Sequence, residues 1–84
     1  MKYFSYVIGS KDPIGKTYVG WTTNVKKRIQ KHNSGKGAKS TRGRKWTLIY
    51  KKTFFNKVDA MKSEYLIKHN KKLRNLIRKK FEKK

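Results

Sequence analysis

The sequence predicts an α+β fold in which a small three-stranded, mostly antiparallel sheet is flanked by helices in the order β-β-α-β-α-α. Two short runs of aromatic and β-branched residues flank a cluster of turn-forming residues near the N-terminus, a pattern typical of a β-hairpin. Apolar residues recur at helical spacing between residues 25 and 33 and again beyond residue 56. A run with partial alternation lies between these helical stretches and supplies the remaining strand.

The first two strands are expected at residues 3–9 and 17–21. The first run, Tyr-Phe-Ser-Tyr-Val-Ile-Gly, leads into a turn cluster at residues 9–13 that cannot continue a strand. The second run has the same aromatic and β-branched character. We therefore expect an antiparallel hairpin whose loop is centred on Pro13 and Gly15.

A helix is expected to follow the hairpin. Asn24 has the side chain of a helix N-cap, because its oxygen can accept a hydrogen bond from a backbone N–H of the first turn. Val25 and Ile29 are spaced by one turn, and a Ser-Gly pair after Asn33 is a stop signal. The helix should therefore end at about Asn33.

The third strand is expected at residues 46–55, where apolar residues alternate only in part. Beyond Asn56, the helical spacing of Val58, Met61 and Tyr65 predicts a helix with these residues as core positions. A further apolar stripe follows Asn70 and consists of Leu73, Leu76, Ile77 and Phe81. The end of the chain is therefore either two helices or one long bent helix.

No internal repeat or linker interrupts this pattern. We expect one domain over residues 1–84, with a core at about 1–70 and a basic C-terminal helix at 71–84. A core of this size is small, yet the hydrophobic residues, 35% of the chain, are clustered rather than dispersed. That clustering favours a folded domain over disorder.

The charge balance indicates a polyanionic partner. The chain has 25 Lys and Arg residues against 4 Asp and Glu residues, a net charge of +21. A small domain needs a net charge of only about 2 to 8 for solubility, and a larger excess causes self-repulsion. A nucleic-acid backbone neutralises such an excess. A lysine-rich composition without a specific partner remains the alternative.

A basic loop is expected at residues 34–45, where glycines and cations occur without an apolar period. Its cations are expected to contact nucleic-acid phosphates, which position a protein without reading sequence. These residues are Lys36, Lys39, Arg42, Arg44 and Lys45.

Other classes of protein are excluded. An acidic membrane surface would require a long amphipathic helix or a lipid anchor, and neither is present in the sequence. The short apolar run at residues 3–9 is unlike a signal peptide, so we expect an intracellular protein. The absence of cysteine excludes disulfides and thiolate zinc sites.

Candidate functional side chains lie at the edges of the apolar stripes. Arg28 and His32 are one turn apart on the same side of the first helix, although such a pair is commonly just a solvated flank. Glu64 borders the stripe of the second helix, where an ordinary ion pair with Lys68 is the alternative. A carboxylate facing a polyphosphate needs a hard cation such as Mg²⁺ between them.

Tyr6 and Tyr18 fall on the two hairpin strands. Tyrosine is a common structural residue of strands, but both phenols would emerge on one face near Arg28 if the strands pair. Neighbouring cations would then lower the pKa of a phenol and help it act as a base.

Taken in order, these residues resemble the GIY-YIG nuclease family. The family motifs correspond to Phe4-Ser5-Tyr6 and Tyr18-Val19-Gly20, followed by Arg28, His32 and Glu64. Phe4-Ser5 stands where the family has Gly-Ile, and Val19 replaces Ile. The stretch from Gly35 to Arg42 is similar to the basic loop of the small stand-alone members, which are closest to structure-specific junction nucleases. Asn70 matches a further family asparagine only loosely.

The resemblance implies a GIY-YIG-like fold and metal-assisted hydrolysis of DNA phosphodiester bonds, in repair or recombination. Tyr6 would help to deprotonate water, and Arg28 would hold the scissile phosphate. Glu64 would bind a divalent metal, Mg²⁺ with Mn²⁺ able to substitute. Tyr18 and His32 would orient water and phosphate or share the proton transfer.

The expected partner is DNA, branched or flapped, recognised by shape rather than sequence, because no separate specificity domain is present. The alternative is a non-catalytic DNA- or RNA-binding module that keeps the fold. A ribosome-associated basic protein is a third, weaker interpretation.

Overall fold

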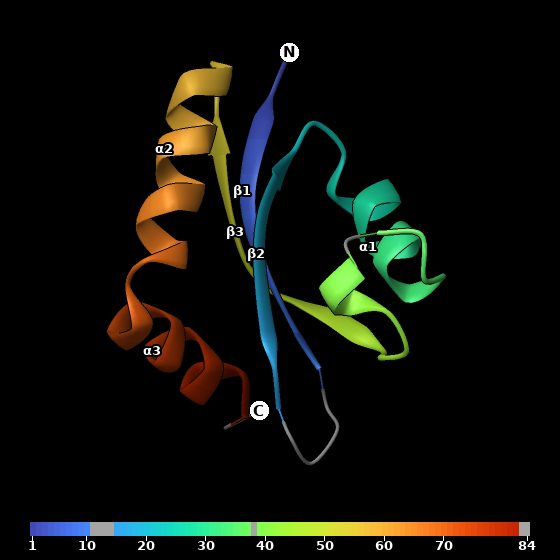
Figure 1. Cartoon of the computed structure of the whole chain (residues 1–84). Helices are drawn as coiled ribbons and strands as arrows, with labels where there is room; N and C mark the ends of the chain where they lie inside the picture. Colours follow the sequence, from blue (N-terminus) through green and yellow to red (C-terminus); the bar gives the residue numbers. More distant parts are fainter. Residues whose placement is uncertain (11–14, 38, 83–84) are drawn as a thin grey trace.

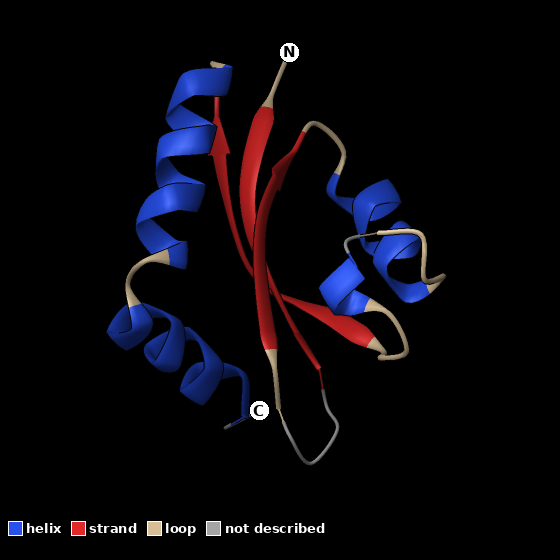
Figure 2. Ribbon diagram, in the orientation of Figure 1, coloured by secondary structure: helices blue, strands red, loops and turns tan. Residues whose placement is uncertain are grey.

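A computed structural model describes residues 1–10, 15–37 and 39–82 and has an antiparallel sheet with the strand order β2-β1-β3 (Figures 1 and 2). The predicted α+β class and the order β-β-α-β-α-α are confirmed. The expected loop centre at Pro13 lies outside the described residues. The elements are β1 Tyr3–Ser10, β2 Thr17–Thr22, α1 Val25–Asn33, a 3₁₀ turn Lys39–Thr41, β3 Trp46–Phe54, α2 Lys57–Lys68 and α3 Lys71–Glu82.

The sheet separates two layers of helix, with α2 and α3 on one face and α1 on the other (Figure 1). Side chains of the central strand β1 alternate between these faces. Val7 packs against Ile67 and Ile77 of α2 and α3. Ile8 packs with Trp46 and, on α1, with Ile29. Each face of β1 therefore has its own apolar core cluster.

Helix α1 begins and ends where the sequence predicts. Asn24 Oδ1 accepts a hydrogen bond from the Lys27 backbone N–H at 3.1 Å, which satisfies one donor of the first turn. Beyond the last turn, Gly35 takes a φ of 81°, a value that favours glycine. The cap and the stop define the length of the helix that carries Arg28 and His32.

Strand β3 contains a bulge that explains its partial alternation. The register with β1 shifts between Val7 and Ile8, so that Val7 pairs with Tyr50 and Ile8 pairs with Leu48. Both Ile49 and Tyr50 pack against the cluster under α2 and α3. A bulge places an extra residue in one strand. It also brings Lys51 opposite Tyr6.

Helix α2 packs through a different face from the one its apolar stripe predicts. Ala60 and Ile67 are buried, and Ser63 shares a hydrogen bond of 2.8 Å with Ser5 on β1. Tyr65 is 62% exposed, and Val58 and Met61 are also exposed, so the prediction that these three are core positions is wrong. The small side chains of Ala60 and Ser63 allow the helix backbone to approach the sheet closely, which the larger side chains would prevent.

The chain ends in two helices rather than one bent helix. Asn70 Oδ1 accepts a hydrogen bond from the Leu73 N–H at 3.0 Å and caps the start of α3. Asn70 is therefore a structural cap. Within the predicted stripe of α3, Ile77 is buried, whereas Leu76 is 53% exposed.

The inward face of α2 can be tested by truncating adjacent residues. Ile67 is 3% exposed and Leu66 is 65% exposed. We expect Ile67→Ala to lower the free energy of unfolding by about 2 to 4 kcal/mol, because it leaves a cavity in the core. The matched control Leu66→Ala should change it by no more than about 0.5 kcal/mol. Urea unfolding followed by circular dichroism measures both, and equal losses would contradict the observed helix face.

Candidate active site

The Tyr6 side chain lies across the sheet above Gly20, its partner on β2. A Cβ atom at Gly20 would be 2.6 Å from the Tyr6 phenol oxygen, closer than carbon and oxygen can approach. Tyr6 is 0% exposed. The missing side chain at position 20 is therefore what allows the phenol to lie flat over β2 and to point toward α1.

The Tyr6 phenol contacts both candidate residues of α1. Arg28 Nε donates a hydrogen bond to the phenol oxygen at 3.4 Å, and His32 Nε2 is 2.9 Å from the same oxygen. A buried phenol proton needs an acceptor, and a guanidinium group cannot accept. We therefore assign the Tyr6 O–H as the donor and His32 Nε2 as the acceptor.

Thr41 completes this hydrogen-bonded chain on the other side of the imidazole. Because Nε2 of a neutral His32 accepts from Tyr6, its Nδ1 carries the proton and donates to Thr41 Oγ1, at 3.0 Å. Thr41 is fully buried, and its carbonyl accepts a hydrogen bond of 2.8 Å from the Trp46 indole N–H. The sequence analysis missed Thr41, because a threonine within a basic loop carries no signal of burial.

His32 is buried to a greater degree than a helix flank predicts, with 0% exposure. Burial first, and the charge of Arg28 second, hold the pKa of His32 below its ordinary value. The imidazole is therefore neutral at neutral pH. A neutral imidazole is the form that accepts the proton of Tyr6.

Arg28 does lower the pKa of Tyr6, as expected, but it does not determine the net direction of the shift. Burial raises this pKa above its ordinary value, and this effect exceeds the lowering by the hydrogen bond and charge of Arg28. In contrast, the hydrogen bond from Arg28 to Tyr6 raises the pKa of the guanidinium group. In the resting site the phenol is neutral and Arg28 carries the positive charge.

Tyr18 packs against this group of residues, and Glu64 interacts electrostatically with Tyr6. The Tyr18 ring lies with its centroid 4.8 Å from that of His32, and Tyr18 contributes to raising the pKa of Arg28. Tyr18 is half-buried and therefore more accessible than Tyr6. Glu64 is half-buried on α2, and its negative charge contributes to raising the pKa of Tyr6. Within the described part of the chain, Glu64 makes no ion pair with Lys68.

The donor set at Glu64 suits a hard cation that shares its coordination with a substrate. Among residues 1–10, 15–37 and 39–82, no group of at least 3 His, Cys, Asp or Glu side chains lies together. A closed zinc site needs about four such ligands, whereas Mg²⁺ is commonly held by one or two carboxylates, water and phosphate oxygens. A single carboxylate within electrostatic reach of Tyr6 fits the second case.

Cations and a helix start surround Arg28. A shallow hollow at the beginning of α1 is lined by Thr22, Thr23, Asn24, Lys27, Arg28 and Lys31. In the predicted basic loop, Lys36, Lys39, Arg42 and Lys45 are exposed and Arg44 is half-buried. Positive charge at an exposed helix N-terminus favours phosphate binding.

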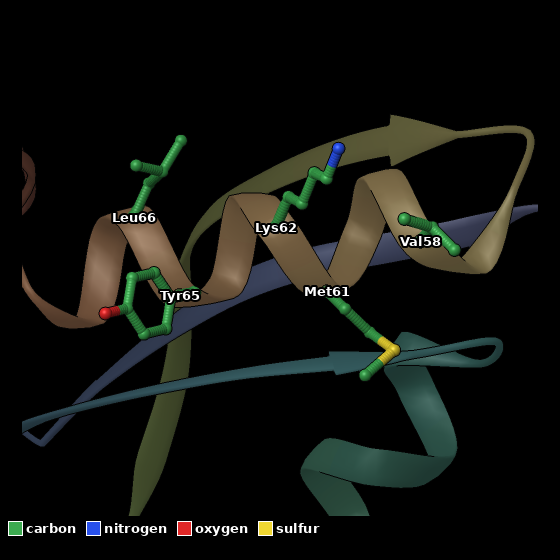
Figure 3. Close-up of a pocket in the computed structure, with 5 residues that line it drawn as sticks. All are labelled: Val58, Met61, Lys62, Tyr65 and Leu66. Atoms are coloured by element: carbon green, nitrogen blue, oxygen red, sulfur yellow. The ribbon is translucent and has the colours of Figure 1, made fainter.

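A separate apolar hollow lies along the exposed side of α2 (Figure 3). Its lining residues are Val58, Met61, Lys62, Tyr65 and Leu66. It contains none of the residues of the Tyr6 hydrogen-bonded chain and no carboxylate. The hydrogen-bonded ionisable groups therefore lie at the other site, between β1, β2 and α1.

In the part of the chain that the structure describes, no helix is long and apolar enough to cross a membrane.

The chain is similar to known proteins over most of its length. Residues 2–78 match the sequence profile of the GIY-YIG catalytic domain. The UPF0213 protein BH0048 of Halalkalibacterium halodurans is 47% identical over 70 residues, covering 82% of this chain and 72% of that protein. The UPF0213 protein SH2523 of Staphylococcus haemolyticus is 46% identical over 68 residues, covering 80% of each. The solution NMR structure of the UPF0213 protein BH0048 from Bacillus halodurans superposes with a TM-score of 0.55 at 40% identity, covering 92% of this chain and 82% of that one.

The assignment of the His32 tautomer can be tested with Thr41→Val, which keeps the shape of the side chain and removes its hydroxyl. We expect nitrogen-15 NMR of the wild-type protein to show the Nδ1–H tautomer, and the variant to lose this preference. An unsatisfied buried donor should also cost about 1 to 3 kcal/mol of stability. Thr47→Val, at an exposed position of β3, is the matched control. A wild-type protein with the Nε2–H tautomer would overturn the assignment.

Stability should depend on pH through His32. Because its pKa is lowered in the folded state, the unfolded chain binds a proton more readily than the folded chain does. The free energy of unfolding should therefore fall as the pH drops below about 6.5, the ordinary pKa of histidine. His32→Gln should flatten this part of the profile, measured by urea unfolding between pH 7.5 and pH 5 in steps of about half a unit. Profiles of equal slope in both proteins would exclude His32 as the cause.

Proposed function

The chain belongs to the GIY-YIG family, and from that premise we propose that it is a metal-dependent endonuclease that hydrolyses DNA phosphodiester bonds. The observation that supports this most directly is the hydrogen-bonded chain of half-buried Arg28 with buried Tyr6 and His32, with Glu64 close enough to affect Tyr6 electrostatically. A purely structural helix flank has no need for a neutral imidazole and a phenol joined in this way. DNA is the substrate class that both the family and the net charge of +21 support.

Arg28 binds the scissile phosphate. Its guanidinium group keeps its charge at any physiological pH and can present two parallel donors to phosphate oxygens. It lies between the Tyr6 phenol and the hollow at the start of α1, to which Lys27 and Lys31 add positive charge. As the phosphorane-like transition state gains negative charge, this preorganised group stabilises it.

Tyr6 and His32 take up the proton of the attacking water. The bond between Arg28 Nε and the phenol oxygen is long, at 3.4 Å, so Arg28 can turn toward a bound phosphate and uncover the phenol. As the water oxygen bonds to phosphorus, its proton moves to Tyr6 Oη and the phenol proton moves to His32 Nε2. The bond from phosphorus to the leaving oxygen breaks with its electron pair on that oxygen, which takes a proton from solvent water, and the imidazolium that remains is held through Nδ1 by Thr41.

Tyr18 and Glu64 act at the rim of this site. The half-buried Tyr18 phenol, beside Arg28, orients the water and the phosphate. Glu64 would hold a divalent cation, Mg²⁺ or Mn²⁺, which supplies stabilisation of charge on the leaving oxygen when bound. The carboxylate would also offset part of the surrounding positive charge.

Substrate choice would depend on DNA shape, with branched or flapped DNA preferred. The described part of the chain presents exposed Lys and Arg side chains at Lys36, Lys39, Arg42 and Lys45, which suit phosphates. Phosphate contacts determine position and orientation but carry little sequence information. The basic loop is thus a non-sequence-specific contact beside the Tyr6 site.

Cleavage assays with Glu64→Ala and Arg28→Ala test the proposal. Wild-type protein with Mg²⁺ should nick supercoiled plasmid and cut flapped duplexes, and each variant should lose at least about 100-fold in rate. Glu64→Ala should still bind DNA, at least as tightly as wild type without metal, because a like charge has been removed from the phosphate site.

Asp59→Ala is the matched control, because it removes the same charge from the exposed side of the same helix. It should cleave at the wild-type rate. If folded wild-type protein nicks no DNA with either metal, the nuclease proposal is contradicted and the chain is a non-catalytic binding module. Equal cleavage by wild type and Glu64→Ala would exclude Glu64 from the reaction.

A further inference from the structure

The face of the sheet that carries Tyr6 continues toward the start of β1, where Phe4 and Thr22 are half-buried and Thr53 is exposed. Residues directly opposite each other on antiparallel strands share a face. Gly20, Tyr6 and Lys51 therefore form one row across β2, β1 and β3. The adjacent row, closer to the N-terminus of β1, is formed by Thr22, Phe4 and Thr53 on the same face.

Phe4 is the one aromatic side chain of this outer row. It is half-buried, and the Lys51 ammonium lies 5.5 Å from the centroid of its ring. Its neighbours in the row, Thr22 and Thr53, have short side chains that do not extend over a phenyl ring. Thr22 also lines the hollow beside Arg28, so the ring and the phosphate site adjoin each other.

We propose that Phe4 and Lys51 form a subsite that stacks one unpaired nucleobase of the nucleotide next to the scissile phosphate. This inference rests on the proposed function, because it places the scissile phosphate at Arg28. Phe4 and Tyr6 are two residues apart on β1, so their side chains are separated by about 7 Å, and Tyr6 in turn contacts Arg28. A base on the Phe4 ring therefore belongs to a nucleotide adjoining the phosphate at Arg28, and Lys51 neutralises the next phosphate.

The chemistry of the ring selects for an unpaired base. A base inside a duplex has both of its faces covered by neighbouring base pairs, so a protein ring can stack only on a base that is terminal, flapped or displaced. Stacking tolerates any base, because every base has a π face. Phe4 thus provides shape selection without sequence selection, as the proposed function requires.

A second phenyl ring in the same sheet serves as a control for this argument. Phe54 lies under Lys52 at the same distance, 5.5 Å, but it pairs with Tyr3 and points to the face covered by α2. A lysine over a phenylalanine ring is therefore not in itself a nucleic-acid site. What distinguishes Phe4 is its place on the face that carries Tyr6, one row away from it.

The test compares binding of a fluorescein-labelled oligothymidylate with binding of a blunt DNA hairpin, both in EDTA so that nothing is cut. Phe4→Leu should weaken binding of the single strand about tenfold and leave hairpin binding within about twofold. Phe4→Trp should bind the single strand at least as tightly as wild type. Phe54→Leu should match wild type for both probes.

Thermal unfolding checks that each variant is folded. If Phe4→Leu does not fold, Phe4→Trp still tests the inference. Wild-type affinity of Phe4→Leu for the single strand, or an equal loss on both probes, would overturn the subsite. Phe4-dependent binding by a protein that never cleaves would leave the subsite in place and contradict the nuclease. If the wild type cleaves DNA but Phe4→Leu binds the single strand as wild type does, the nuclease stands and the subsite is contradicted.

Discussion

The contact between the Tyr6 ring and Gly20 is the constraint on which the rest of the site depends. A Cβ at Gly20 would overlap the phenol, so the ring can cross β2 only at a glycine. That crossing directs the phenol oxygen toward α1, where it meets Arg28 and His32. The cap at Asn24 determines where α1 starts and hence the turn on which these two residues lie. Strands β1 and β2, the cap at Asn24 and helix α1 thus together determine the position and hydrogen bonds of the Tyr6 phenol oxygen.

Burial determines the charge state of this site in a chain whose net charge is +21. Burial raises the pKa of Tyr6 and lowers that of His32, so both groups are neutral at rest and Arg28 carries the positive charge. Uncharged partners keep the cost of desolvation low. A phosphate at Arg28 would supply the opposite charge that the buried site lacks, which links substrate binding to the start of proton transfer.

Sequence pattern predicted secondary structure better than it predicted which helix face is buried. The cap at Asn24 and the strands of the hairpin depend on local backbone chemistry, and they lie where the sequence predicts. On α2, the large side chains of Met61 and Tyr65 face outward, while Ala60 and Ser63 approach the sheet. Periodicity identifies a helix. How closely that helix approaches the sheet depends on the volumes of the side chains on both the helix and the sheet. Thr41 was missed for a similar reason, since its burial comes from Trp46 and His32.

By itself, the sequence determined the α+β class, the order of elements, the excess of positive charge and the residue types that resemble a nuclease motif. Those features follow from local propensity, composition and spacing, which act within a few residues along the chain. Only the tertiary structure decided that Tyr6 is buried and neutral, that Thr41 orients His32, and that Phe4 lies one row from Tyr6 on the same face of the sheet. These depend on strand register and desolvation, which join residues far apart in the chain.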